Sequence, residues 1–107
     1  MKNERFEQIV ANTQERLEDL MKLKGGEYAS EADRLSNFKK NAEALGLDPM
    51  QVWAVYAGKH WDAVQTYIRD LASGVERPRL ESIQGRADDL IVYLHLFHGL
   101  LEDSEQK

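Results

Sequence analysis

The chain has 107 residues and a mass of 12.3 kDa, which is enough for one domain around one hydrophobic core. Its 14 lysines and arginines stand against 19 aspartates and glutamates. The resulting formal net charge of −5 excludes the broad positive surface that nonspecific binding of duplex nucleic acid requires. There is no cysteine, which excludes disulfides, thiolate metal sites and thiol catalysis.

The location of the protein is inferred from three features of the sequence. The chain begins with mostly polar and charged residues, and its longest apolar stretch, residues 90–101, is too short to span a membrane. The lack of cysteine also fits a reducing compartment. We therefore expect a cytoplasmic protein without a membrane segment.

Two helices are predicted in the first half of the chain. The first is expected over about residues 3–24, because apolar side chains recur at helical spacing and Gly25-Gly26 can end the helix. The side chains of this face are Phe6, Val10, Thr13, Leu17, Leu20 and Met21. A second helix is expected over about residues 31–45, with Ser30 as its amino-terminal cap and Gly46 at its end.

A third helix is predicted over residues 49–73. Asp48 is suited to cap it, Pro49 suits its first position, and Gly74 follows its end. One face of this helix combines aromatic, aliphatic and histidine side chains: Trp53, Ala57, His60, Val64, Tyr67, Ile68 and Leu71.

A fourth helix is predicted over about residues 78–102, opened by Pro78. Its expected inward face consists of Leu80, Ile83, Ala87, Leu90, Ile91, Leu94, Phe97 and Leu101. A second stripe, Tyr93, Leu96 and Leu100, makes its second half apolar nearly all round, which favours a place in a subunit interface over the centre of a bundle. The sequence thus predicts an all-α fold, a single domain over residues 1–107 arranged as a four-helix antiparallel bundle, in a homodimer or larger homo-oligomer.

Acidic side chains of the fourth helix are the first candidates for chemistry. Glu81 and Asp88 share a face roughly opposite the inward stripe, where a solvated acidic face is the simplest interpretation. Asp89 falls at the edge of packed surface. A carboxylate held there either pairs with a cation such as Arg86 or Lys59 or binds a divalent metal, and the sequence leaves both open.

Further polar candidates lie on the other helices. His60 is placed on an apolar face, where a core histidine is a commoner role than a ligand, and Asp62 points away from it, toward solvent or a partner subunit. Tyr28, Asn37 and Phe38 flank the first loop. An aromatic ring and an amide there are suited to hold a nucleobase, while surface exposure or local capping explains Asn37 equally well.

Three short segments, in this order and spacing, have a familiar pattern. They are Glu27-Tyr28 with Asn37-Phe38, Lys59-His60, and Glu81-Ser82-Ile83 continuing through Asp89-Leu90 to Tyr93-Leu94. The pattern covers roughly residues 5–101. It resembles the small phage and prophage proteins of the nucleotide modification associated domain, which are similar to the all-α MazG-like nucleotide pyrophosphatases.

The resemblance implies a nucleotide as ligand and Mg²⁺ as cofactor. Active members hold Mg²⁺ with carboxylates on two facing helices and cleave a nucleoside triphosphate to pyrophosphate and a monophosphate. Carried onto this chain, it implies Asp89 and Glu81 as catalytic residues. The implied metal ligands are Glu81, Asp88, Asp89 and Asp62, and the implied phosphate or nucleotide contacts are Lys59, Arg86, His60, Tyr28, Asn37 and Tyr93.

The chain departs from the family pattern on two helices. On the earlier one, MazG-like enzymes have a Glu-x-x-Glu pair, whereas the segment Lys59–Asp62 has Asp62 as its one acid. Gly58 and Gly85 stand where aspartates are expected, and Arg86 stands where an acid belongs. Three functions therefore stay open: a Mg²⁺-dependent pyrophosphohydrolase, a protein that binds a nucleotide or nucleotide signal without hydrolysis, and a helical protein-interaction module. The module would use an apolar anchor that includes Trp53, Trp61, Leu96 and Leu100.

Overall fold

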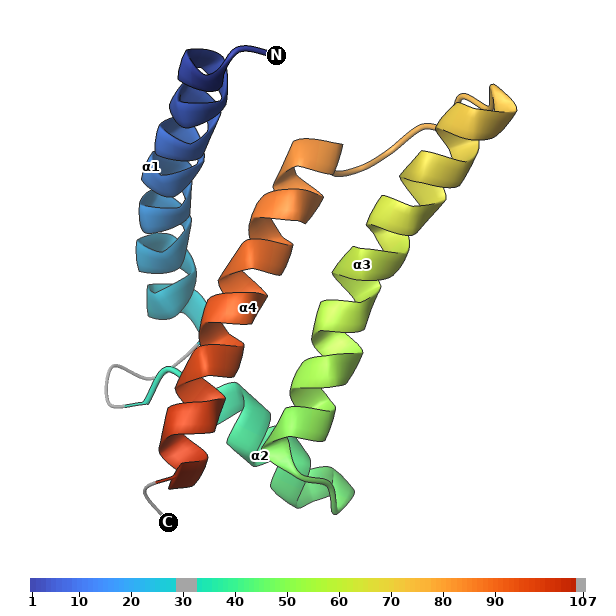
Figure 1. Ribbon diagram of the computed structural model, residues 1–107. Coiled ribbons are helices and arrows are strands. Elements are labelled where there is room, and N and C mark those ends of the chain that lie inside the picture. The colour runs from blue at the N-terminus through green and yellow to red at the C-terminus, as the bar shows by residue number, and fades with distance from the viewer. Residues whose placement is uncertain (29–32, 106–107) are drawn as a thin grey trace.

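The computed structural model describes residues 1–28 and 33–105, with the backbone alone for residues 24–28 (Figure 1). It contains the helices α1 (Asn3–Tyr28), α2 (Ser36–Leu45), α3 (Pro49–Ser73) and α4 (Ile83–Glu105). No strand is assigned in this described part of the chain. The predicted all-α fold is therefore confirmed.

Helix α4 lies between α1 and α3 (Figure 1). Helix α3 runs antiparallel to α4, and the short α2 lies across the end of this pair where α3 begins and α4 ends. The core sits at that end: its buried members are Leu35, Phe38, Ala42, Val52 and Leu100. Phe38 brings its ring to 6.0 Å from the ring of Tyr56 in α3 and to 6.3 Å from that of Tyr93 in α4. One aromatic side chain of α2 thus joins the two long helices.

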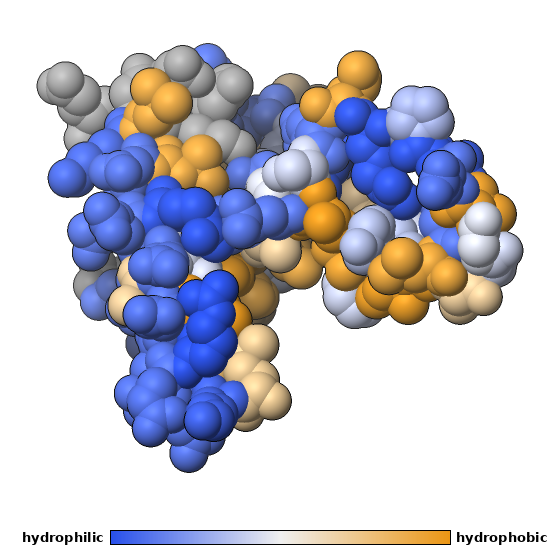
Figure 2. All heavy atoms as spheres, turned by 90° about the horizontal axis from the view of Figure 1, so that it is seen from above, coloured by the Kyte–Doolittle hydropathy of each residue, from blue (hydrophilic) through white to orange (hydrophobic). Residues whose placement is uncertain are grey.

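The amino-terminal half of α1 has few neighbours. Within residues 1–12 only Ile9 is even half-buried, whereas Leu17, further along the same apolar stripe, is buried. Figure 2 shows the resulting shape from above: the left-hand arm, on the side of α1, is mostly hydrophilic, and apolar residues line the inner side of the bend. The predicted apolar face of the first helix therefore packs in its second half, and Phe6 and Val10 stay exposed.

Helix α3 has the predicted bounds because both its ends carry strong local signals. The Asp48 side chain accepts a hydrogen bond from the Met50 backbone N–H, and the Gln51 side chain accepts one from the Asp48 backbone N–H. This capping box satisfies amides that the first helical turn leaves without partners. Gly74 ends the helix in the left-handed conformation, with φ of 68°.

Three predicted helix ends are wrong. Gly25-Gly26 do not end α1, which continues to Tyr28, because a glycine costs a helix only about 1 kcal/mol. Helix α2 begins at Ser36 rather than near residue 31, after a turn in which Asp33 accepts a hydrogen bond from the Leu35 N–H. The expected cap, Ser30, lies outside the described residues.

The start of α4 is the third correction. Helix α4 begins at Ile83 and not at Pro78, and it runs on to Glu105. Ser82 provides the start signal, because its hydroxyl accepts a hydrogen bond from the Gly85 N–H at 2.9 Å. Residues 75–80 form an extended link, in which Leu80 is fully exposed.

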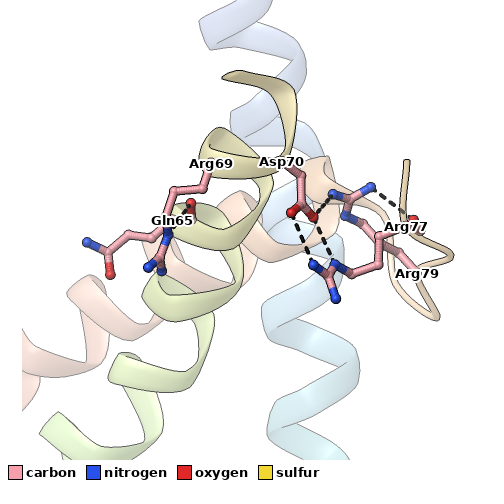
Figure 3. A network of polar contacts seen from close by, with 5 residues as sticks. All are labelled: Gln65, Arg69, Asp70, Arg77 and Arg79. Carbon is pink, nitrogen blue, oxygen red and sulfur yellow. Dashed lines mark hydrogen bonds and ion pairs between the residues drawn. The ribbon is translucent and has the colours of Figure 1, made fainter. Parts of the chain in front are cut away.

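The link between α3 and α4 is fixed by a buried carboxylate (Figure 3). Asp70, 6% exposed, accepts hydrogen bonds from Arg77 at 2.9 and 3.2 Å and from Arg79 at 3.2 Å. The Arg79 guanidinium also lies 4.9 Å from the centre of the Tyr67 ring, within the range of a cation–π contact. Hydrogen bonding from Arg77 is the main cause of a lowered pKa of Asp70.

The inward side of α4 differs from the predicted one. Leu100 is buried, and Tyr93 and Leu96 pack against the core, so the stripe that was considered as a protein anchor lies inside the protomer. Phe97 of the predicted inward stripe packs against Trp53. Of the predicted inward stripe, Ile91, Leu94 and Leu101 are exposed. Both stripes are apolar, so periodicity alone could not rank them. No described helix has the length and apolarity required to cross a membrane.

Candidate functional site

The first polar contact of the candidate site joins α1 to α4. Asp88, only 8% exposed, accepts hydrogen bonds from Arg16 Nε at 2.9 Å and Nη2 at 3.3 Å. Arg16 also donates to Thr13 Oγ1, and its hydrogen bond to Asp88 raises its pKa. The expected solvated position of Asp88 is therefore wrong, because α1 packs on that side of α4 and supplies a cation to the carboxylate.

A second group of polar side chains lies between α3 and α4. His60 Nδ1 stands 3.4 Å from Arg86 Nη1 and 3.7 Å from Asp89 Oδ2. The His60 ring centre is 5.1 Å from that of Tyr93. A neutral Nδ1 can accept a hydrogen bond from Arg86, whereas a protonated ring is attracted to Asp89. His60 thus connects the arginine and the buried carboxylate, and its protonation state determines which contact is stronger.

Arg86 also forms an ion pair with Glu81, which stands two positions before the start of α4. Its Nε lies 3.3 Å from a carboxylate oxygen of Glu81, and about half of the Glu81 side chain is exposed. These contacts form a chain that leads from the exposed Glu81 to the buried Asp89. Its intermediate members are Arg86 of α4 and His60 of α3.

An open groove runs between α1 and the beginning of α4, with a volume of about 560 Å³. Its walls bring together four carboxylates with one cation, one hydroxyl and two leucines. The lining residues are Arg16, Asp19, Leu20, Leu23, Glu81, Ser82, Gly85, Asp88 and Asp89. Gly85, one of the two positions where the family pattern has an aspartate, lies within this lining.

The remaining predicted site residues lie elsewhere. Lys59 and Asp62 are exposed on α3, and neither lines the groove. Asp62 follows His60 by two residues, which turns it about 200° away from the α4 side of the helix. Asn37 is half-buried in α2, next to the core residue Phe38. The Tyr28 side chain lies outside what the structure describes.

The described acidic side chains near the groove do not form a metal-binding group. Among the described side chains, those of residues 1–23 and 33–105, no three histidine, aspartate or glutamate residues are arranged to hold an ion. Arg16 binds both oxygens of Asp88, and Arg86 is paired with Glu81. In this arrangement the residues do not fit Mg²⁺, which needs several oxygen ligands in near-octahedral geometry.

Two charged groove residues, Arg16 and Asp19, were not predicted as site residues. They lie on α1, outside all three segments of the family pattern. The available signal is weak: Arg16 precedes the stripe residue Leu20 by four positions, so it borders the apolar face and can reach a neighbouring helix. Only the packing of α1 on α4 gives Arg16 a partner 72 positions away.

Comparisons with known proteins give no relative for this chain. No family model matches it, and no curated protein or solved structure is similar enough to count as a match.

Proposed function

We propose that this chain is a MazG-like nucleotide-handling protein of the phage type, and that it binds its nucleotide without hydrolysing it. The observation that carries the proposal is that two segments of the family pattern, far apart in the sequence, meet in space. His60 from the Lys59-His60 segment contacts Asp89 and Tyr93 from the last segment. His60, Asp89 and Tyr93, three of the residues that motivated the resemblance, are therefore neighbours next to the groove.

Arg86 is the proposed phosphate contact. Its pairing with Glu81 is partly exposed, and ion pairs of that kind contribute about 0–1 kcal/mol. A phosphate offers the guanidinium two parallel charge-assisted hydrogen bonds, so it can replace Glu81 as a partner. The imidazole of His60 lies 3.4 Å from Arg86, and its ring centre is 5.1 Å from that of the Tyr93 ring.

The choice of binding over hydrolysis rests on the acidic residues. The family pattern expects acids where this chain has Gly58, Gly85 and Arg86. Asp88 is bound by Arg16, and the described residues do not provide a three-ligand metal group. A site that holds phosphate by guanidinium needs no metal, whereas pyrophosphate release in this family depends on one.

The test is a thermal-shift panel of nucleoside mono-, di- and triphosphates and cyclic nucleotides, each with Mg²⁺ and with EDTA. A ligand at 100 times its Kd stabilises the folded state by about 2.7 kcal/mol, so at least one nucleotide should raise Tm by several degrees in both conditions. Arg86→Gln should abolish the rise. Arg5→Gln should retain it, because Arg5 is exposed on α1 and donates only to Gln8 among the side-chain contacts described.

Two results would contradict the proposal. A rise in Tm that needs Mg²⁺, together with pyrophosphate release, would assign the hydrolase instead. A panel without any shift would remove nucleotide binding and favour the protein-interaction module.

A further inference from the structure

The link between α3 and α4, residues 75–80, is an extended segment that α3 holds through two arginines. Arg77 donates hydrogen bonds from Nε and Nη2 to the two oxygens of Asp70, and Arg79 donates one from Nη2 to the same carboxylate (Figure 3). The Arg79 guanidinium also lies 4.9 Å from the centre of the Tyr67 ring. Alternate residues of the link are thus fixed against the last turns of α3.

The two arginine contacts determine where the side chains next to them point. Successive side chains of an extended chain point to opposite sides. Since Arg77 and Arg79 reach toward α3, Pro78 and Leu80 point away from it. Leu80 is accordingly fully exposed, although it follows directly on a residue that is bound to the helix. The exposure of Leu80 therefore results from the way in which the link is held.

Two further apolar side chains are exposed beside the link. Leu71 is 64% exposed and lies about 40° around α3 from Tyr67, on the side of the helix that the link covers. Val75 is 47% exposed, and its N–H donates to the Asp70 carbonyl. A cluster of exposed apolar side chains is typical of an interaction site, whereas single ones are normal on any surface. We refer to the following residues as the corner patch: Leu71, Val75, Arg77, Arg79 and Leu80.

The corner patch is positive on an acidic chain. Residues 67–80 contain three arginines against Asp70 and Glu76, a net charge of +1, while the rest of the chain has a net charge of −6. Asp70 is buried, so it is already enclosed by the two guanidiniums that it binds. More than half of the Arg77 side chain is exposed, and its described hydrogen bonds use only Nε and Nη2. Its Nη1 can therefore donate to an acceptor from outside.

We propose that the corner patch binds an acidic segment of another protein, whose carboxylates pair with Arg77 and Arg79 and whose apolar side chains pack on Leu80. Complementarity of charge selects a short segment, because a larger anionic surface would also meet the rest of the chain, which is negative. The link is already fixed, so binding loses little of its conformational freedom. The groove lining includes no residue of the link, which separates the corner patch from the proposed nucleotide site.

Selection from a phage-displayed library of random short peptides tests the proposal, with the whole chain as bait. The selected peptides should be acidic and contain apolar residues. Each is then labelled and titrated by fluorescence anisotropy. Leu80→Ser should raise the Kd about tenfold or more, because it removes the central apolar anchor. Leu45→Ser should leave the Kd unchanged, since Leu45 is also an exposed leucine but lies at the end of α2.

The contribution of charge is tested by a second pair of variants. Arg77→Gln should raise the Kd of the selected peptides, whereas Arg5→Gln, on the exposed surface of α1, should not. Added salt should weaken binding to the wild type, because the ion pairs form at an exposed surface. The salt series and Leu80→Ser decide the matter if Arg77→Gln, which removes a partner of Asp70, does not fold.

Four results would overturn the proposal. The library would yield no binding peptide, or only basic or uncharged ones. Leu80→Ser and Leu45→Ser would change the Kd equally. Vesicles containing phosphatidylserine would bind the wild type and not Leu80→Ser, which would assign the patch to a membrane surface. Arg86→Gln should leave peptide binding intact, so a failure of nucleotide binding and a failure of this proposal are distinguishable.

Discussion

Asp70 is a buried carboxylate that two arginines bind. Arg77 and Arg79 lower its pKa in the folded state below the ordinary value of 3.8. A lowered folded-state pKa means that the carboxylate stabilises the fold above pH 3.8 and that this contribution is lost as the pH falls through the folded-state value.

We therefore expect Asp70→Asn to lower Tm by several degrees at pH 7, because both arginines lose their ionic partner at the end of α3. The difference in Tm between variant and wild type should shrink as the pH falls below 3.8. Circular dichroism melts over a pH series measure this difference. A difference of constant size down to the lowest pH would mean that packing, and not charge, gives Asp70 its role. Glu76→Gln, an exposed neighbour in the link, is the control and should show no such trend.

At the residue scale, the sequence located polar candidates better than it located their partners. Asp89 was expected at the edge of packed surface and is buried there, next to His60. Asp88 was expected in solvent, and Arg16 of α1 binds it instead. Periodicity gives the direction of a side chain around its own helix, but it does not show which distant helix will pack there. Contacts separated by 72 positions are therefore beyond single-helix patterns.

At the scale of elements, the sequence predicted the helix ends that depend on residues within a single turn. Both ends of α3 were predicted because an N-cap aspartate, a proline and a terminal glycine act within one turn. The start of α4 was not, since proline suits an extended link as well as a first helical turn, and the contacts of Arg77 and Arg79 with Asp70 hold residues 75–80 out of the helix.

The capping box of α3 yields a prediction at this scale. Asp48→Ala should destabilise the fold by about 1 kcal/mol, because the Met50 N–H loses its acceptor at the helix start. Asp48→Asn should leave the stability nearly unchanged, since asparagine caps a helix as well as aspartate does. Urea denaturation of the three proteins measures the difference. Equal losses in the two variants would show that the negative charge, rather than the capping hydrogen bond, supplies the stabilisation.

At the scale of the whole molecule, α4 has two apolar stripes, one packed and one exposed, that its sequence alone could not distinguish. Leu100 and Tyr93 hold α2 and α3 within the protomer, while Leu94 and Ile91 face outward. The expectation of an apolar helix that serves an interface remains a proposal, but it now refers to the opposite stripe.

Thermal unfolding should then depend on protein concentration. If two folded chains unfold together, a tenfold increase in concentration stabilises the dimer by about 1.4 kcal/mol, which for twice 107 residues corresponds to a rise in Tm of about 3 °C. Calorimetry at three concentrations spanning two decades measures this slope. Leu94→Glu should remove the slope and Leu45→Glu should keep it, because only the first places a charge on the exposed stripe of α4, whereas Leu45 lies at the end of α2. A wild-type Tm that is independent of concentration would mean that the exposed stripe of α4 is not covered by a second copy.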